Sequence, residues 1–525
     1  MKPDLSKWRE RAARVRGFLA RRYISLPLAA LAALGLSFAA EHLGIRAKLG
    51  IGGEEISLLA IAVVSILIFT ALACRILARG ERFDGQKHLH SLLYGLILLA
   101  CLGICISEVK NLGEPIDYDG GVNIGYQNIF IQQLDAFEKG QVHLDLYVDP
   151  RLESMENPYD TAERDRLGIF YHWDHAYFEG KYYSYFGLAP IISVYYPYYL
   201  LTGVLPTVEA VCMLLAAAAL YFLAGALREL TIFLKASPPL PLMLLALPAL
   251  AFGCGIFPGQ SYSDFYYIPV LSSMCFNFAF FYLALRACRA RHTVSAAFLF
   301  GGGALAFVFS VMSRPTAALI CLTLTPVIFH SFFLGRKPLS ARLARILPFG
   351  AVICAGAAFI MWFNYARFGS PLDFGANYQL TVNDVSTNTV TLSVLPDAIF
   401  HYFIQFPNAR EIFPFYGPSF ISLDYGERFV YLDATIGALF FPATAGLIIC
   451  PFFYGMRERI RTLRRRDNTR TLVCACGAAI IPIIAFADFC KAGVNTILRD
   501  FSRFGSGAFL RASNFSIYGM ARFSD

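Results

Sequence analysis

Two aspartates stand one residue apart, Asp117 and Asp119, in the stretch EPIDYDGG at 114–121. They follow an apolar run that ends at residue 107. In an extended chain, residues i and i+2 point to the same side, so both carboxylates can belong to one small site. Such a pair can hold a divalent metal, or one carboxylate can act as a base while the other orients it. The alternative is a solvated turn after a helix, because a D-x-D pair is common in loops.

Three basic residues are candidates for binding an anionic group such as a phosphate: Arg314, Lys181 and Arg367. Arg314 stands in SRPTA (313–317) between two apolar runs, where an arginine is costly unless it is paired or functional. Its alternative is a side chain that extends to the lipid headgroups. The alternative for Lys181, in EGKYYSYFG (179–187), is a surface lysine in a charged turn. Arg367 stands in YARFG (365–369) and is a third candidate of the same kind.

The composition indicates that membrane-spanning helices position these residues. Only 16% of the 525 residues are charged and 57% are hydrophobic, whereas a soluble domain carries about 25% charged residues. The sequence therefore predicts an all-α polytopic membrane protein with about eleven spans, each an apolar run near the length that crosses a bilayer. The predicted spans are 24–40, 56–74, 91–107, 204–227, 239–257, 266–285, 294–313, 316–334, 346–363, 434–455 and 471–488.

The distribution of charge orients the predicted spans. Lys and Arg gather in the N-terminal stem (1–23) and in the short loops after every second span, for example RERIRTLRRR at 457–466. The positive-inside rule then places the N-terminus in the cytoplasm and the long loops 108–203 and 364–433 outside. The first of these loops contains 15 acidic and 6 basic residues. Its aromatic stretch 188–202 is expected to form a helix that lies on the outer interface or dips into it.

Two further features exclude other classes of protein. The 13 cysteines lie almost entirely within apolar runs, so no disulfide framework is expected. The net charge of +8 comes from loops between spans, and nothing resembles a nucleic-acid-binding module, so no nucleic-acid partner is expected.

The order of motifs resembles that of a known family. A span that leads outward is followed by the D-x-D stretch, a long loop, KYYSYFG (181–187), SRPTA (313–317) and NYARFGSPLDFGANYQL (364–380). This order resembles the integral-membrane glycosyltransferases of the type C fold (GT-C). That family includes the protein O-mannosyltransferases, the lipid A aminoarabinose transferases and many uncharacterised bacterial relatives. The resemblance covers roughly residues 90–490.

The resemblance implies sugar transfer at the outer face of the cytoplasmic (inner) membrane. The donor would be a polyprenyl-phosphate sugar, and the acceptor a hydroxyl group of a lipid, a glycan or a protein. The catalytic base would be Asp119 or Asp117; the glycines that follow favour Asp119, and a divalent metal at the pair stays an alternative. Arg314, Lys181 and Arg367 would meet the leaving phosphate, because that step needs cations.

The motif YHWDH (171–175) and the tyrosines after it are expected to contact the sugar or the acceptor. The residues concerned are His172, Trp173, Asp174, Tyr182 and Tyr183. The spacing H-x-D-H is not a usual zinc pattern, so loop hydrogen bonds or ligand contacts are preferred to a metal. For Trp173 and the tyrosines, an interfacial anchor is the alternative.

The chain divides into six parts on this interpretation. A GT-C-like core at 91–363 contains the outer catalytic loop 108–203, and it follows the cytoplasmic stem and an extra hairpin with its loop at 24–90. The second outer loop (364–433) and the C-terminal spans (434–488) come next. The tail 489–525 contains LRDFS, which resembles a stretch that precedes another span in relatives; we expect a truncated or altered tail because that span is missing.

Two other functions fit an apolar chain with large loops. A transporter or flippase for a lipid-linked envelope precursor would place polar or charged residues at mid-membrane depth, but the predicted spans are almost free of charge. A non-catalytic envelope assembly protein would not depend on Asp117 or Asp119. The acidic outer loop therefore favours chemistry at the membrane surface.

Overall fold

The computed structural model describes the central part of the chain. The described residues are 81–85, 87–108, 113–117, 128–233, 237–257, 264–333, 337–381 and 384–386, with the backbone of four short strands between 408 and 435. The stem 1–23, the predicted spans 24–40, 56–74 and 471–488, and the tail 489–525 lie outside the described residues, as does the predicted span 434–455 after residue 435.

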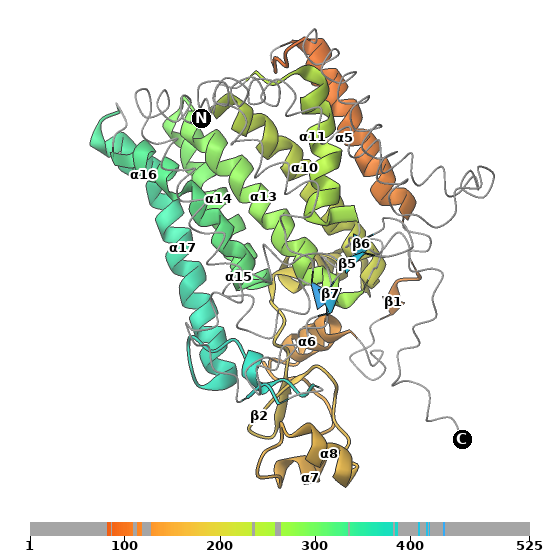
Figure 1. Ribbon diagram of the computed structural model, residues 1–525. Helices are drawn as coiled ribbons and strands as arrows, with labels where there is room; N and C mark the ends of the chain where they lie inside the picture. The colour runs from red at the N-terminus through yellow and green to blue at the C-terminus, as the bar shows by residue number, and fades with distance from the viewer. Residues whose placement is uncertain are drawn as a thin grey trace, which may run out of the picture.

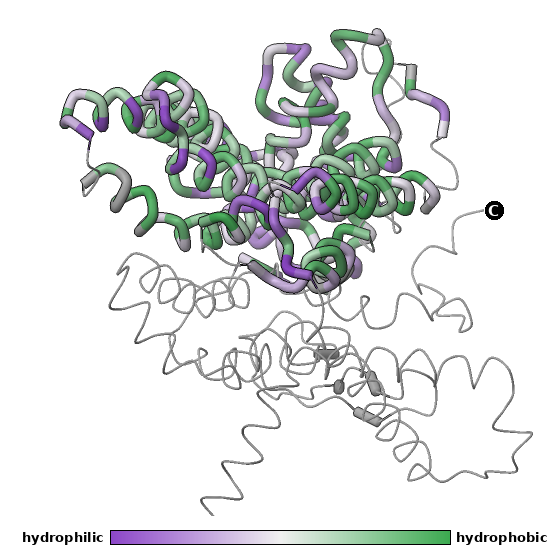
Figure 2. Tube along the Cα trace, turned by 90° about the horizontal axis from the view of Figure 1, so that it is seen from above, coloured by the Kyte–Doolittle hydropathy of each residue, from purple (hydrophilic) through white to green (hydrophobic). Residues whose placement is uncertain are grey.

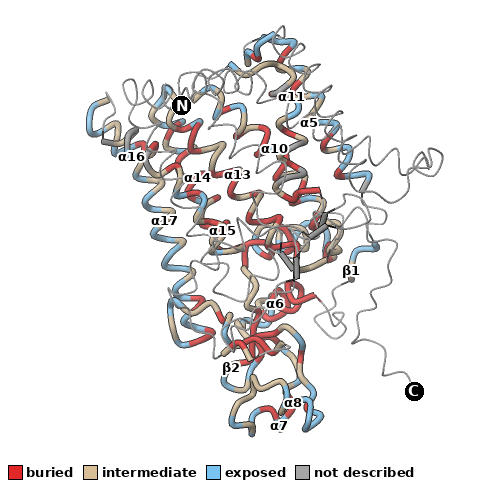
Figure 3. The backbone as a smooth tube through the Cα atoms, in the orientation of Figure 1, coloured by how far each residue is buried: buried red, intermediate tan, exposed pale blue. Residues whose placement is uncertain are grey.

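The described part is mostly helical, and five of its helices are long and apolar enough to cross a membrane. These helices are α5 (His88–Glu108), α10 (Val208–Phe233), α13 (Ile268–Arg289), α14 (Thr293–Ser313) and α17 (Leu339–Phe368). They pack side by side in chain order, α5 on α10, α10 on α13, α13 on α14 and α14 on α17 (Figure 1). The most apolar stretch is 67% buried in α13 and 6% buried in α17, so α13 is central and α17 lies at an edge (Figure 3).

Glycines set the closest contacts between these helices. A Cβ atom on Gly225 of α10 would lie 2.7 Å from the Tyr282 ring of α13. A Cβ atom on Gly356 of α17 would lie 2.4 Å from the Val308 side chain of α14. Small residues let helix backbones approach closely in a membrane, where the hydrophobic effect does not drive association. The two glycines therefore help to fix the order of the bundle.

Two predicted spans are not single long helices. In place of a helix over 239–257, α11 (Leu240–Cys254) has 15 residues with Pro248 inside it. In place of a helix over 316–334, the chain forms α15 (Pro315–Ala318), the 3₁₀ segment η3 (Leu319–Leu324) and α16 (Thr325–Phe333). Proline has no backbone N–H to donate, so Pro326 removes one helical hydrogen bond close to the change of helix type.

A second unit, here named the loop subdomain, consists of residues 128–207 together with 369–381. Its helices are α6 (Ile129–Glu138), α7 (Pro150–Glu153), α8 (Thr161–Leu167), the π-helical segment η1 (Ile191–Tyr195), α9 (Tyr196–Thr202) and the 3₁₀ segment η4 (Ala376–Tyr378). Its strands β2 (Ala176–Phe178) and β3 (Lys181–Tyr183) form an antiparallel hairpin. The side chains of Asn128, Asp149 and Asp160 cap α6, α7 and α8, because each accepts a hydrogen bond from an otherwise unpaired backbone N–H.

Other strands of the described part are two residues long. β1 (Ile116–Asp117) pairs antiparallel with β4 (Val204–Leu205), which leads into α10. Farther along the chain, β5 (Asn408–Ala409) pairs with β6 (Tyr416–Gly417), and β7 (Ser419–Phe420) pairs with β8 (Ala434–Thr435).

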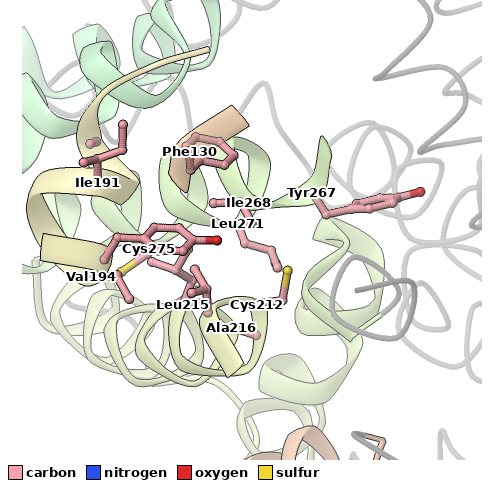
Figure 4. Packing of buried hydrophobic residues seen from close by; sticks show 14 of the residues in the cluster. Phe130, Ile191, Val194, Cys212, Leu215, Ala216, Tyr267, Ile268, Leu271 and Cys275 are labelled. Carbon is pink, nitrogen blue, oxygen red and sulfur yellow. The ribbon is translucent and has the colours of Figure 1, made fainter. Parts of the chain in front are cut away.

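The helix expected over 188–202 is present as η1 followed by α9. Ile191 and Val194 of this segment pack with Phe130 of α6 and with Leu215 of α10, in the core that joins the loop subdomain to the bundle (Figure 4). The other end of the segment is apolar and exposed, with Leu200 66% and Leu201 86% accessible. Its location at a membrane interface stays a prediction.

The two ends of the bundle differ in charge. The loop subdomain adjoins the ends of α14 and α17 and the beginnings of α10 and α13 (Figure 1). At the opposite end, these helices and their connecting segments carry a group of basic residues: Arg228, Arg286, Arg289, Arg291, Lys337, Arg342 and Arg345. Apolar colour dominates the helices between the two ends, and polar colour is concentrated in the connecting segments (Figure 2). This is the arrangement of a helical membrane protein.

Candidate functional site

The predicted aspartate pair lies mostly beyond what the structure describes. Asp119 is outside the described residues, and for Asp117 only the backbone is described. Asp117 lies in β1 opposite Val204, at the end of the bundle that carries the loop subdomain. The sequence-based role of the pair therefore stays a prediction.

Asp174 is held at the junction between the loop subdomain and the bundle. Its carboxylate accepts hydrogen bonds from the hydroxyl groups of Tyr266 and Tyr185. Tyr266 belongs to the 3₁₀ segment η2 (Phe265–Tyr267), directly before α13, and Tyr185 follows β3. A tyrosine of the loop subdomain and a tyrosine 92 residues away thus meet at one carboxylate.

The backbone of Asp174 explains the direction of its side chain. Its φ angle is +60°, in the left-handed region that few residues other than glycine adopt. Its N–H donates to the carbonyl of Leu380 at 2.9 Å, and the Leu380 N–H donates to the carbonyl of His175 at 2.9 Å. These two bonds join residues 174–175 to the segment after α17 and maintain the unusual turn. Asparagine and aspartate tolerate this conformation better than most residues.

Arg314 acts electrostatically on the same tyrosine. It is the residue between α14 and α15, with extended backbone angles (φ −157°, ψ 101°) that end the first helix. Burial raises the pKa of the Tyr185 hydroxyl well above its ordinary value, the negative charge of Asp174 raises it further, and the positive charge of Arg314 opposes the shift. Tyr185 therefore stays protonated and can donate a hydrogen bond. Asp174, Tyr185 and Arg314 are each of intermediate exposure, although the Tyr185 hydroxyl itself is buried.

A buried polar network supports the helix break at Arg314. The Asn277 side chain of α13 donates to the carbonyl of Ala317 at 3.1 Å and accepts from the hydroxyl of Ser310 at 2.7 Å. Asn277 thereby satisfies a carbonyl that the interrupted helix leaves without its usual partner. The loop after β3 also approaches the break, because a Cβ atom on Gly187 would lie 1.8 Å from the Met312 carbonyl oxygen. Only glycine fits there.

Arg367, the third predicted cation in chain order, fastens α17 to the segment beside Tyr185. Its side chain is 6% exposed, and its Nη1 donates to the carbonyl of Ser184 at 2.6 Å. Its Nη2 donates to the Asn364 side chain at 2.8 Å, and the guanidinium lies 4.0 Å from the Phe363 ring centre. Through its bond to Ser184, Arg367 fixes the position of the segment that carries Tyr185.

Lys181 lies apart from this group. It is exposed at the start of β3, opposite Phe178 in the hairpin. Its charge acts on His143, where burial lowers the imidazole pKa first and the Lys181 charge lowers it further. The structure therefore brings together Arg314 and Asp174 of the predicted residues, and it places Lys181 elsewhere on the loop subdomain.

His172, Tyr182 and Tyr183 of the predicted contact set are buried, as is the neighbouring His175. Tyr182 is fully buried, and its hydroxyl accepts a hydrogen bond from the backbone N–H of His172 at 3.3 Å. Tyr183 packs on Phe368 with ring centres 5.3 Å apart. Burial lowers the pKa of His172 and lowers the pKa of His175 to about 4. These four residues form the core of the loop subdomain.

Trp173 is the member of the contact set that faces outward, with 47% of its surface accessible. Its ring centre lies 6.4 Å from that of Tyr171. An exposed indole of this kind can stack on a sugar ring or lie among lipid headgroups.

No group of three or more His, Cys, Asp or Glu residues in the described part of the chain could hold a metal ion. The Asp117 side chain and Asp119 are not among these described residues.

The chain matches no family model, no curated protein and no solved structure.

Sequence reasoning did not single out Tyr185, Tyr266 or Asn277. Tyr185 lies within the quoted motif KYYSYFG, but the motif alone does not indicate which tyrosine meets a charge. Tyr266 is 92 residues from Asp174, so their contact depends on the fold. Asn277 offered a signal, because an amide within an apolar span needs a polar partner.

Proposed function

We propose that the protein is a membrane glycosyltransferase that moves a sugar from a polyprenyl-phosphate donor to an acceptor hydroxyl. The observation that carries the proposal is the group formed by Asp174, Tyr185 and Arg314 where the loop subdomain meets the apolar bundle. Such a junction offers polar groups to a sugar phosphate while the helices offer an apolar surface to its lipid tail. GT-C-like architecture with about eleven spans belongs to the same proposal.

The chemistry needs a base on one side and a cation on the other. A carboxylate removes the proton of the acceptor hydroxyl, the oxygen attacks the anomeric carbon, and the bond from that carbon to the phosphate oxygen breaks. The leaving phosphate takes the electron pair of that bond. Arg314 would stabilise this charge, and the neutral Tyr185 would donate a hydrogen bond to it. The base would be Asp119 or Asp117, with Asp174 orienting Tyr185.

We further propose that the chain lies in the cytoplasmic (inner) membrane of a bacterium. Its N-terminus would be cytoplasmic and the loop subdomain would lie outside. The basic residues at the opposite end of the bundle support this orientation, because cytoplasmic loops carry an excess of Lys and Arg.

One observation favours transport as a second candidate. The 3₁₀ segment η3 interrupts the α-helical geometry between α15 and α16, and transporters use irregular helices at their binding sites. A flippase for a lipid-linked precursor would move its substrate between leaflets without forming a glycoside.

A transfer assay with purified protein and polyprenyl-phosphate sugars tests the proposal. We expect Arg314→Gln and Asp119→Asn each to lower the rate by about 10²–10³-fold, as the loss of a group that stabilises or activates the transition state does. The same assay is applied to Asp174→Asn and Asp117→Asn, which gives four variants. Glu156→Gln is the matched control, because Glu156 is an exposed acid of the same loop. Full activity of all four variants would reject the mechanism, and lipid movement without glycoside formation would favour the flippase.

A further inference from the structure

A groove runs between α14 and α17 at the basic end of the bundle. Its volume is about 420 Å³, and it is lined by residues 293–305 of α14 together with Ala344, Pro348 and Val352 of α17. Gly301 and Gly302 belong to the lining, and a Cβ atom on Gly301 would lie 3.4 Å from Pro348 of α17. The exposed rim includes Phe298, 78% of whose surface is accessible.

The length of the groove along α14 is close to the thickness of one membrane leaflet. Twelve residue steps along α14, from 293 to 305, span about 18 Å at 1.5 Å per residue. The hydrocarbon core of a bilayer is about 30 Å thick, so a groove that begins at its edge covers roughly one leaflet. A single hydrocarbon chain lying along α14 would fit this length.

Three basic residues surround the end of the groove near Thr293. The Arg345 guanidinium donates to the carbonyl of Ala287 at 3.0 Å and to that of Ala290 at 3.2 Å. The Lys337 ammonium donates to the carbonyl of Arg291 at 2.6 Å. Two cations of the α17 end are thus fixed against the turn between α13 and α14, beside the exposed Arg291.

No acidic residue neighbours these cations in the sequence. Between Asp264 and Asp373 the chain contains no Asp or Glu. Glu229 of α10, from the same end of the bundle, is paired with Arg289 at 2.6 Å. The positive charge at the mouth of the groove is therefore complementary to an anion, and the apolar lining is complementary to a hydrocarbon chain.

We propose that this groove binds an anionic phospholipid of the adjacent leaflet. One acyl chain lies between α14 and α17, and the phosphate lies at Arg291 and Lys337, while the buried Arg345 holds the turn between α13 and α14. The site is distinct from the proposed sugar-transfer site, which adjoins the other end of α14. It does not depend on the proposed function, so it can be tested whether or not the protein transfers sugar.

Native mass spectrometry of the full chain tests the proposal. The probes are phosphatidylglycerol and phosphatidylcholine with the same acyl chains, added to the detergent-purified protein in equal amounts. We expect selective retention of phosphatidylglycerol, since anionic headgroups gain about 1 kcal/mol per basic residue. Arg291→Gln is expected to weaken that retention about fivefold.

Two substitutions separate the groove from the general lipid-facing surface. Ala344→Phe is expected to fill the groove and to abolish selective retention. Ala358→Phe is the matched control, because Ala358 is exposed on the same helix but does not line the groove. Equal retention of the two lipids by the parent chain, or selective retention that survives Ala344→Phe, would overturn the proposal.

A photocrosslinker at position 298 identifies the occupant directly. With Phe298→benzoylphenylalanine, we expect an adduct whose added mass is that of a phospholipid. An adduct to another peptide of this chain would overturn the proposal, because the groove would then be covered by protein. The melting temperature of each variant confirms that it is folded.

Discussion

His175 illustrates how burial determines protonation in the loop subdomain. Its Nδ1 lies 2.7 Å from the Trp173 carbonyl oxygen and its Nε2 lies 2.8 Å from Oε1 of Gln132. Burial lowers the imidazole pKa to about 4, so the ring is neutral at pH 7 and carries one proton. Both neighbours of the ring are oxygen atoms, so one ring nitrogen donates to its neighbour and the other lacks a donor. If Nδ1 donates to the carbonyl, turning the Gln132 amide by 180° supplies an N–H to Nε2. The amide orientation follows from the protonation state.

The buried His175 makes the stability of the fold dependent on pH. The unfolded imidazole titrates near pH 6.5 and the folded one near pH 4, so between these values only the unfolded chain binds the proton. The stabilisation is complete above pH 6.5 and is lost as the pH falls towards 4. Lowering the pH from 7.5 to 5 should cost about 2 kcal/mol of unfolding free energy from this group.

Chemical denaturation in detergent at the two pH values measures this effect. His175→Gln should reduce the difference between them, whereas His292→Gln, at an exposed position, should leave it in place. An unchanged pH dependence in His175→Gln would contradict the assignment.

The elements around Arg314 are held by a close approach of two backbones. The loop after β3 meets the last turn of α14 at Gly187 and Met312, and Arg367 of α17 holds the same loop through Ser184. The position of Tyr185 therefore depends on α14 and α17 together. A change in this loop should affect both the stability of the junction and the geometry of the site.

Gly187→Ala tests that dependence. An added Cβ atom would lie 1.8 Å from a backbone oxygen, which no side-chain movement can relieve. We expect a destabilisation of at least about 2 kcal/mol and a large loss of transfer activity. Gly103→Ala is the control, because a Cβ atom there meets nothing within 4 Å. Thermal unfolding of the two variants distinguishes them, and equal melting temperatures would refute the close approach.

The elements show which parts of the fold the sequence could predict. Uninterrupted apolar runs predicted α5, α13 and α14 well. The helix predicted over 346–363 extends to Leu339–Phe368, because Arg345 and Arg367 hydrogen-bond to carbonyls of neighbouring segments and can lie within it. The change from 3₁₀ to α-helix between Leu324 and Thr325 was not predicted. An apolar run does not show where the pattern of backbone hydrogen bonds changes.

The site was predicted in part for a similar reason. Arg314 and Asp174 were singled out because a charge is costly near an apolar span or conspicuous in an aromatic loop. Their meeting through Tyr185 depends on how the loop subdomain packs on the bundle, which local sequence does not encode. The positions of the Asp117 carboxylate and of Asp119 stay predictions.

At the scale of the whole molecule, charge and chain direction separate the two ends. The basic residues at one end and the loop subdomain at the other predict opposite sides of the membrane. In intact cells, an impermeant maleimide should label Ser154→Cys, an exposed position of the loop subdomain, beyond the level of the parent chain. Ser340→Cys, exposed at the basic end, should react only after permeabilisation. The reverse pattern would invert the proposed orientation.

Because α17 lies at the edge of the bundle, the fluorescence of its tryptophan can report on contact with lipid. The chain contains three tryptophans, and Trp362 is 58% exposed on α17, whereas Trp173 is exposed in the loop subdomain. In a Trp8→Phe background reconstituted in vesicles, brominated acyl chains should quench the Trp362 fluorescence and aqueous iodide should quench the Trp173 fluorescence. Iodide quenching of both indoles to the same extent would show that α17 does not face lipid. Intrinsic emission can thus report how deeply the bundle is immersed.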